Sequence, residues 1–92
     1  QDAGLEMSQL RTLQQSELPP GSIEGWQFII PSHCEDCGGK ILIFSQLADA
    51  EKIADAWRGM GQHVYVKAGV LLQINGRIPT DVADQYGEVL LQ

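Results

Sequence analysis

The sequence has few basic residues, and they are scattered along the chain. Six lysines and arginines stand against twelve aspartates and glutamates, which leaves a formal net charge of -6. Proteins that bind nucleic acid through charge replace counterions with clustered Lys and Arg side chains. An anionic membrane surface attracts the same kind of cluster. The composition therefore argues against binding to nucleic acid or to a membrane surface by charge.

Long apolar runs and cysteines are also scarce. No stretch approaches the roughly 18 apolar residues that a membrane-spanning helix needs, so no membrane span is predicted. Two cysteines are too few for a small fold held together mainly by disulfides. The 92 residues, of which 43% are hydrophobic, instead predict one small globular domain with a modest core.

The chain carries no recognisable catalytic motif. The glycines at 38–39 and 59–61 do not join a strand to a helix with the spacing of a phosphate-binding loop. His63 opens a predicted strand, and no serine or cysteine nucleophile with a recognisable context accompanies it. We therefore predict that the protein is not an enzyme and that it needs no cofactor, unless it binds zinc through the loop described next.

One loop suggests chemistry, and it reads Cys34-Glu35-Asp36-Cys37-Gly38-Gly39. A Cys-x-x-Cys pair forms a disulfide, contributes to a metal site or acts as a redox pair, and the sequence leaves all three open. Acidic residues between the two sulfurs, and a strand rather than a helix after them, disfavour a reactive thiolate. A structural disulfide between Cys34 and Cys37 is the favoured interpretation.

The zinc alternative rests on the same two cysteines and on the histidines. Cys-x-x-Cys-Gly resembles a zinc knuckle, and a structural zinc ion takes four ligands. Cys34 and Cys37 supply two of them, while His33 is adjacent and His63 lies elsewhere in the chain. Stoichiometric zinc in the purified protein would favour this alternative over the disulfide.

Hydrophobic periodicity predicts a two-layer α+β sandwich. Residues 1–25 are expected to form an N-terminal helical segment and linker, and residues 26–92 the α+β domain. Apolar residues at every position of 41–44 are typical of a strand that is covered on both faces. The predicted fold is a mostly antiparallel, four-stranded, ferredoxin-like sheet with two helices packed on it. Its strands are expected at 26–30, 41–44, 63–67 and 70–75, and its helices at 48–60 and 80–91.

The tryptophans are expected in the core. Trp57 falls on the apolar stripe of the helix at 48–60. Trp26 lies next to the N-terminal segment, and an exposed tryptophan at that place would serve as an anchor for a binding partner. Trp26 is therefore the candidate binding residue outside the cysteine loop.

The stretch from Lys40 to Leu91 resembles two families. The run Gly76-Arg77-Ile78-Pro79 followed by Tyr86 resembles small exported bacterial lipoproteins of unknown function. That resemblance implies export and a lipid anchor on a cysteine before Gln1, which is removed or absent here. The chain begins at Gln1 without a methionine, which we expect either of a processed form or of a fragment excised from a longer chain.

Two further stretches, Ile43 to Glu51 and Gly61 to Val66, resemble the sporulation-related (SPOR) repeat. This resemblance implies a four-stranded ferredoxin-like sheet and peptidoglycan binding. The sequence departs from that family after Leu72, where Asn75-Gly76-Arg77-Ile78-Pro79 replaces a glycine-rich strand end and an Ala-Glu helix start.

These observations predict a non-enzymatic binding or protein-interaction domain of the bacterial cell envelope. It is expected outside the cytoplasm, in the periplasm or at the cell surface, with a protein or peptidoglycan as its partner. The alternative is a zinc-binding or thiol-redox protein that acts through Cys34 and Cys37.

Overall fold

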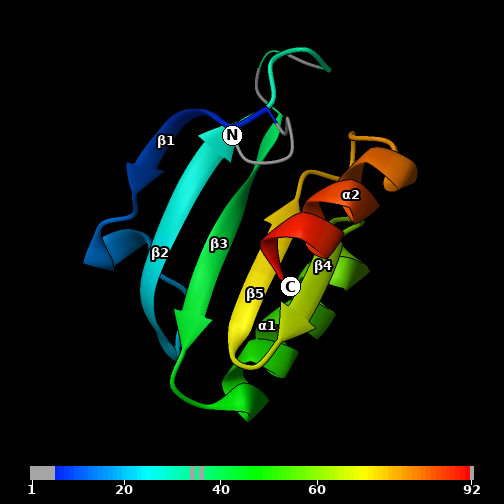
Figure 1. Cartoon of the computed structure of the whole chain (residues 1–92). Helices are drawn as coiled ribbons and strands as arrows, with labels where there is room; N and C mark the ends of the chain where they lie inside the picture. The colour runs from blue at the N-terminus through cyan, green and yellow to red at the C-terminus, as the bar shows by residue number, and fades with distance from the viewer. Residues whose placement is uncertain (1–5, 34, 36, 92) are drawn as a thin grey trace.

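The computed structural model describes residues 6–33, 35 and 37–91, which form an antiparallel sheet between two helices (Figure 1). The sheet has five strands in the order β1-β2-β3-β5-β4, and every neighbouring pair is antiparallel. The predicted α+β class is therefore confirmed. The elements are β1 (Ser8–Thr12), a 3₁₀ turn η2 (Gln15–Glu17), β2 (Ser22–Ile29), β3 (Gly38–Phe44), α1 (Leu47–Gly59), β4 (His63–Lys67), β5 (Val70–Ile74) and α2 (Thr80–Leu90).

The prediction of an N-terminal helix and of only four strands was wrong. Residues 8–12 form the edge strand β1, which pairs with β2, and β2 begins at Ser22 and spans the predicted boundary between residues 25 and 26. Leu10 and Leu13 do not share a buried face, as they would on one side of a helix, because Leu10 is 55% exposed whereas Leu13 is 6% exposed. Gln9 has a φ of 53°, and the register shifts between Ser8 and Arg11, which marks a β-bulge at this edge.

The two helices pack on opposite faces of the sheet, so the predicted two-layer arrangement was also wrong. In Figure 1, α2 lies in front of the sheet and α1 behind it. Leu71 packs with Ala50 and Ala54 of α1, while the next residue, Leu72, packs with Ala83 of α2. Successive side chains of a strand point to opposite faces, so this contact pattern requires three layers. Within the described residues, neither helix is long and apolar enough to cross a membrane.

The order of the strands gives a split β-α-β unit. β3 and β4 are each antiparallel to β5, which lies between them, and they are therefore parallel to each other. Helix α1 connects β3 to β4 and covers the face of the sheet that carries Leu42, Phe44 and Leu71. A unit of this kind also occurs in ferredoxin-like folds. In this protein, helix α1 leaves part of the sheet surface uncovered beside its C-terminal end, and a hollow lies at that place.

Candidate functional site

The cysteine loop connects β2 to β3, and its last cysteine belongs to the core. Cys37 is completely buried in an apolar cluster with Phe28, Ile74 and Tyr86. The amide of Ile30 donates a hydrogen bond of 2.7 Å to the Cys37 carbonyl and closes the hairpin. Burial among apolar side chains is typical of a structural cysteine. Cys34 lies outside the described residues, so the Cys34–Cys37 disulfide stays a prediction.

The two histidines occupy different places. His33 is exposed in the turn after β2. His63 begins β4, and its Nε2 lies 2.7 Å from the carbonyl oxygen of Ile78. A carbonyl oxygen only accepts, so this nitrogen donates, and His63 fastens the segment that leads into α2. Among the described residues, no group of three or more His, Cys, Asp or Glu side chains is placed to hold a metal ion, and the zinc alternative remains untested.

The glycines after the cysteines are needed by the sheet. A Cβ atom at Gly38 would overlap the Phe28 carbonyl oxygen and lie 2.7 Å from the Ile29 Cα. A Cβ atom at Gly39 would meet the Gln73 carbonyl oxygen, and it would lie 2.9 Å from the Phe28 ring. Both residues are buried at the start of β3. The Gly-Gly pair therefore lets β3 pass close to the backbones of its two neighbours.

Trp26, the predicted binding anchor, is half-buried in β2. In the sheet register it lies between Thr12 of β1 and Ile41 of β3. The next residue, Gln27, faces the other side of the sheet, because side chains alternate along a strand. Trp26 thus lies on the α2 side, away from the hollow beside α1, and its role as an anchor stays a prediction.

The hollow beside the C-terminal end of α1 has a volume of about 420 Å³ and is the strongest candidate for a binding site. Its floor contains Gln27, Lys40 and Gln73, which come from three neighbouring strands and form one row because they are paired in register. Trp57 and Met60 line it from the end of α1, and Gln62 and Asn75 complete its polar lining. We call this hollow the amide groove.

The amide groove combines one cation with an apolar wall. The Lys40 Nζ lies 5.8 Å from the centre of the Trp57 ring, which is the geometry of a cation–π contact. Met60, at the end of α1, is a large apolar side chain that is 65% exposed. The lining among the described residues contains no aspartate or glutamate. The groove therefore offers a positive charge, several amides and an exposed thioether to a ligand.

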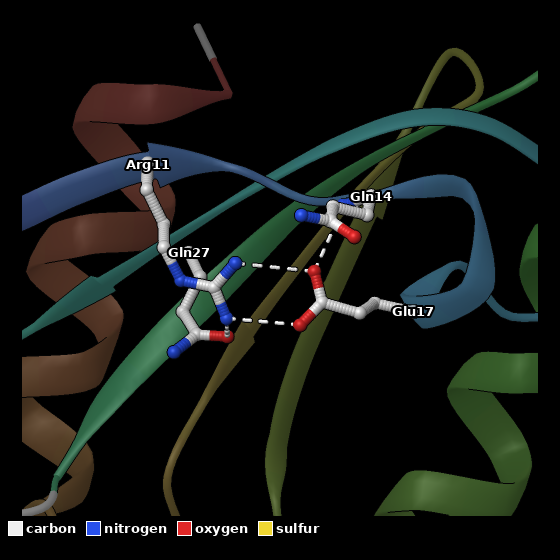
Figure 2. Close-up of polar contacts among 4 residues, drawn as sticks. All are labelled: Arg11, Gln14, Glu17 and Gln27. Carbon is white, nitrogen blue, oxygen red and sulfur yellow. Dashed lines mark hydrogen bonds and ion pairs between the residues drawn. The ribbon is translucent and has the colours of Figure 1, made fainter.

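The polar row extends from the groove to β1 (Figure 2). Arg11 donates to both carboxylate oxygens of Glu17, at 3.1 and 3.0 Å, and also to the side-chain oxygen of Gln27 at 3.3 Å. The backbone N–H of Gln14 donates to the same carboxylate at 2.8 Å. These bonds connect η2 to the sheet and fix the orientation of the Gln27 amide at the edge of the groove.

This ion pair predicts a defined dependence of stability on pH. The hydrogen bonds from Arg11 and then from the Gln14 amide lower the pKa of Glu17 from 4.5 to about 2. A carboxyl group with a lowered pKa in the folded state stabilises the fold above its unfolded pKa, and this contribution disappears as the pH falls from about 4.5 to about 2. We expect Glu17→Gln to lower the Tm at about pH 6 and to leave it unchanged near pH 2.

Circular dichroism melts of both proteins across this pH range would measure the effect. High salt serves as the control, because an exposed pair is screened and the difference near pH 6 should shrink. Parallel Tm curves for the wild type and Glu17→Gln at all pH values would contradict the assignment.

Comparison with known proteins gives no further guide. No family model, curated protein or solved structure matches the chain. The resemblances to exported lipoproteins and to the SPOR repeat therefore stay predictions.

Sequence reasoning did not find the amide groove. Its floor residues are Gln27 of β2 together with Lys40 and Gln73, which are the single polar side chains of β3 and β5. They come together only when the register of all three strands is known. The available signal is a single polar residue in an otherwise apolar central strand, as in β3 and β5, because such a side chain marks a place where the sheet meets solvent.

Proposed function

We propose that the chain is a non-enzymatic binding domain of the bacterial cell envelope and that the amide groove is its ligand site. The observation that carries the proposal is the lining of the groove. Lys40, Trp57 and the amides of four neighbouring side chains converge on one concave surface. Concave sites of this kind, with a few oriented polar groups beside an apolar wall, are where proteins bind small ligands.

The lining also supports binding rather than catalysis. Catalytic groups usually have shifted pKa values and lie within reach of one another. The groove is lined by amides, one lysine and apolar side chains, and among the described lining residues it has no histidine, cysteine or carboxylate. These groups hold a ligand through hydrogen bonds and charge, and they provide no nucleophile with a neighbouring base.

Peptidoglycan is the ligand to test first, and an envelope protein is the other candidate. The resemblance to the SPOR repeat implies peptidoglycan binding by a ferredoxin-like sheet, and the two stretches that carry this resemblance lie in the split β-α-β unit around α1. The resemblance to exported lipoproteins supports a location outside the cytoplasm. A wall polymer, with its many hydroxyl, amide and carboxylate groups, suits a groove lined with amides.

The test uses a matched pair of substitutions on one helix. Met60 and Leu47 are both exposed hydrophobic side chains at opposite ends of α1, and only Met60 lines the groove. We expect Met60→Glu to weaken cosedimentation with purified peptidoglycan sacculi about tenfold, because it places a carboxylate at the wall of the groove. Leu47→Glu adds the same charge elsewhere and should bind like the wild type.

Binding should also survive a reductant and a metal chelator if the groove is the site. Loss of binding under either treatment would instead favour the thiol or zinc alternative. If sacculi and envelope extracts retain the wild type no better than an unrelated acidic protein does, the proposal of a binding domain is wrong.

A further inference from the structure

The hydrogen bonds around the amide groove restrict what it can bind. A side-chain amide has an acceptor oxygen and a donor NH₂ group, and which of them a ligand meets depends on what the protein already uses. The oxygens of Gln27, Gln62 and Asn75 each accept from a guanidinium or a backbone amide, which only donate, and this fixes the orientation of these three amides. Gln73, the fourth amide of the groove, instead donates its NH₂ group to Gln62, so its oxygen is an acceptor.

Two of the amides are fixed by such donors. The Oε1 of Gln27 accepts from the Arg11 guanidinium, which has no acceptor. The Oε1 of Gln62 accepts from the Gly76 backbone amide at 3.1 Å and also from the Nε2 of Gln73 at 2.7 Å. In each case the oxygen is engaged, whereas among the described residues nothing accepts a hydrogen bond from the Nε2 of Gln27 or Gln62.

Asn75 and Lys40 follow the same pattern. The Oδ1 of Asn75 accepts from the backbone amide of Arg77 at 2.9 Å, which leaves its NH₂ group as the unused polar group. Lys40 carries three donors and no acceptor. The described part of the chain contains two ion pairs, and neither includes Lys40. The charge of Lys40 helps to lower the pKa of Glu17, but the Glu17 carboxylate already accepts hydrogen bonds from Arg11 and from the backbone N–H of Gln14.

We propose that the amide groove recognises a carboxylate, which Lys40 binds as the cation and the NH₂ groups of Gln27, Gln62 and Asn75 surround as donors. This inference rests on the proposed function and names the chemistry of the ligand. An anion meets a protein whose formal net charge is -6, so its binding depends on short-range donors rather than on long-range attraction. The cation–π contact with Trp57 keeps the Lys40 ammonium over the groove.

Two sources can present this group, namely the C-terminal end of a peptide and an acidic sugar. Each is tested against a neutral derivative of the same compound. N-acetyl-dialanine is compared with its C-terminal amide, and glucuronate with its methyl ester. Titrations followed by the side-chain NH₂ resonances of Gln27, Gln62 and Asn75 report binding in the groove itself. We expect the charged member of at least one pair to bind about tenfold more tightly, which is typical of a hydrogen bond to a charged group.

Substitution of the lysine provides the second arm. Lys40→Met keeps the apolar stem and removes the charge, and it should weaken binding of the carboxylate about tenfold. Lys67→Met is the control, because Lys67 is an exposed lysine of β4 that does not line the groove. A salt titration of the wild-type protein needs no variant, and rising salt should weaken binding of the charged probe alone.

The outcomes separate this inference from the proposed function. Equal binding of charged and neutral probes, or unchanged binding by Lys40→Met, would overturn the assignment of a carboxylate. If sacculi still bind and Met60→Glu still reduces that binding, the groove keeps its proposed function with a neutral ligand. If neither the probes nor the sacculi bind, both proposals fall. The pair with the larger difference identifies the source, either a peptide end or an acidic sugar.

Discussion

Gly38→Ala is expected to lower the free energy of unfolding by about 3 kcal/mol, a large part of the roughly 5–10 kcal/mol available to a chain of this size. The physical reason is a backbone contact. A methyl group at this position would overlap the Phe28 carbonyl oxygen and press on the Ile29 Cα, and neither atom belongs to a side chain that could rotate away. β2 and β3 would have to separate at the base of the cysteine loop.

Gly59→Ala is the matched control. Gly59 is the last residue of α1, and a Cβ atom there would meet nothing within 4 Å. Alanine is favoured over glycine in a helix, so this change should raise the free energy of unfolding by about 0.5 kcal/mol. Urea denaturation of the three proteins, followed by circular dichroism, measures both effects. A Gly38→Ala protein as stable as the wild type would show that the close contact between β2 and β3 is absent.

This prediction also bears on the cysteine loop. In a zinc knuckle, glycines after the cysteines turn backbone amides toward the sulfurs. Here Gly38 and Gly39 are already strand residues, and the space they leave is filled by backbone and by the Phe28 ring. Destabilisation by Gly38→Ala in metal-free protein would therefore separate the packing role of this glycine from any role in binding metal.

The sequence predicted the local structure of the C-terminal two thirds well. The strands expected at 63–67 and 70–75 form β4 and β5, which pair as an antiparallel hairpin. Alternation in the first segment and an apolar run in the second are the signals that predict them. Positive φ values at Ala68 and Gly69, 51° and 83°, fit a two-residue turn of type I′. Such signals are local, so they survive without knowledge of the rest of the fold.

The number of layers and the N-terminal strand could not be predicted from such local signals. Residues 41–44 are apolar at every position, which correctly predicted a strand covered on both faces. A strand that is covered on both faces needs a layer on each side, and the apolar run Val70, Leu71 and Leu72 of β5 carries the same signal. None of the five residues of β1 is buried, and its strand form depends on pairing with β2 rather than on its own pattern.

The candidate site was less accessible to sequence reasoning than the fold. The cysteines and histidines stand out by residue type. His63, however, has a structural contact, because its ring donates a hydrogen bond to the carbonyl oxygen of Ile78. The amide groove depends on the register of β2, β3 and β5 and on where α1 ends. Those are non-local properties, and the residues involved are ordinary polar types with many other uses in proteins.

Truncation of two adjacent leucines tests the three-layer arrangement and should have effects as large as those at Gly38. Leu71 and Leu72 are both completely buried in β5. Removing a buried leucine side chain costs the transfer free energy of its atoms and leaves a cavity, so Leu71→Ala and Leu72→Ala should each cost about 2–5 kcal/mol. Ile23→Ala, at a position that is 62% exposed, is the control and should change stability by no more than about 0.5 kcal/mol.

The decisive measurement is which helix responds to each truncation. Leu71 shares a cluster with Ala50 and Ala54 of α1, and Leu72 shares one with Ala83 of α2. All three alanines are fully buried, and their methyl resonances report on their surroundings. We expect Leu71→Ala to shift the methyl signals of Ala50 and Ala54 and to spare that of Ala83, with the reverse for Leu72→Ala. If both helices lay on one face, a single leucine would move all three signals and its neighbour would move none.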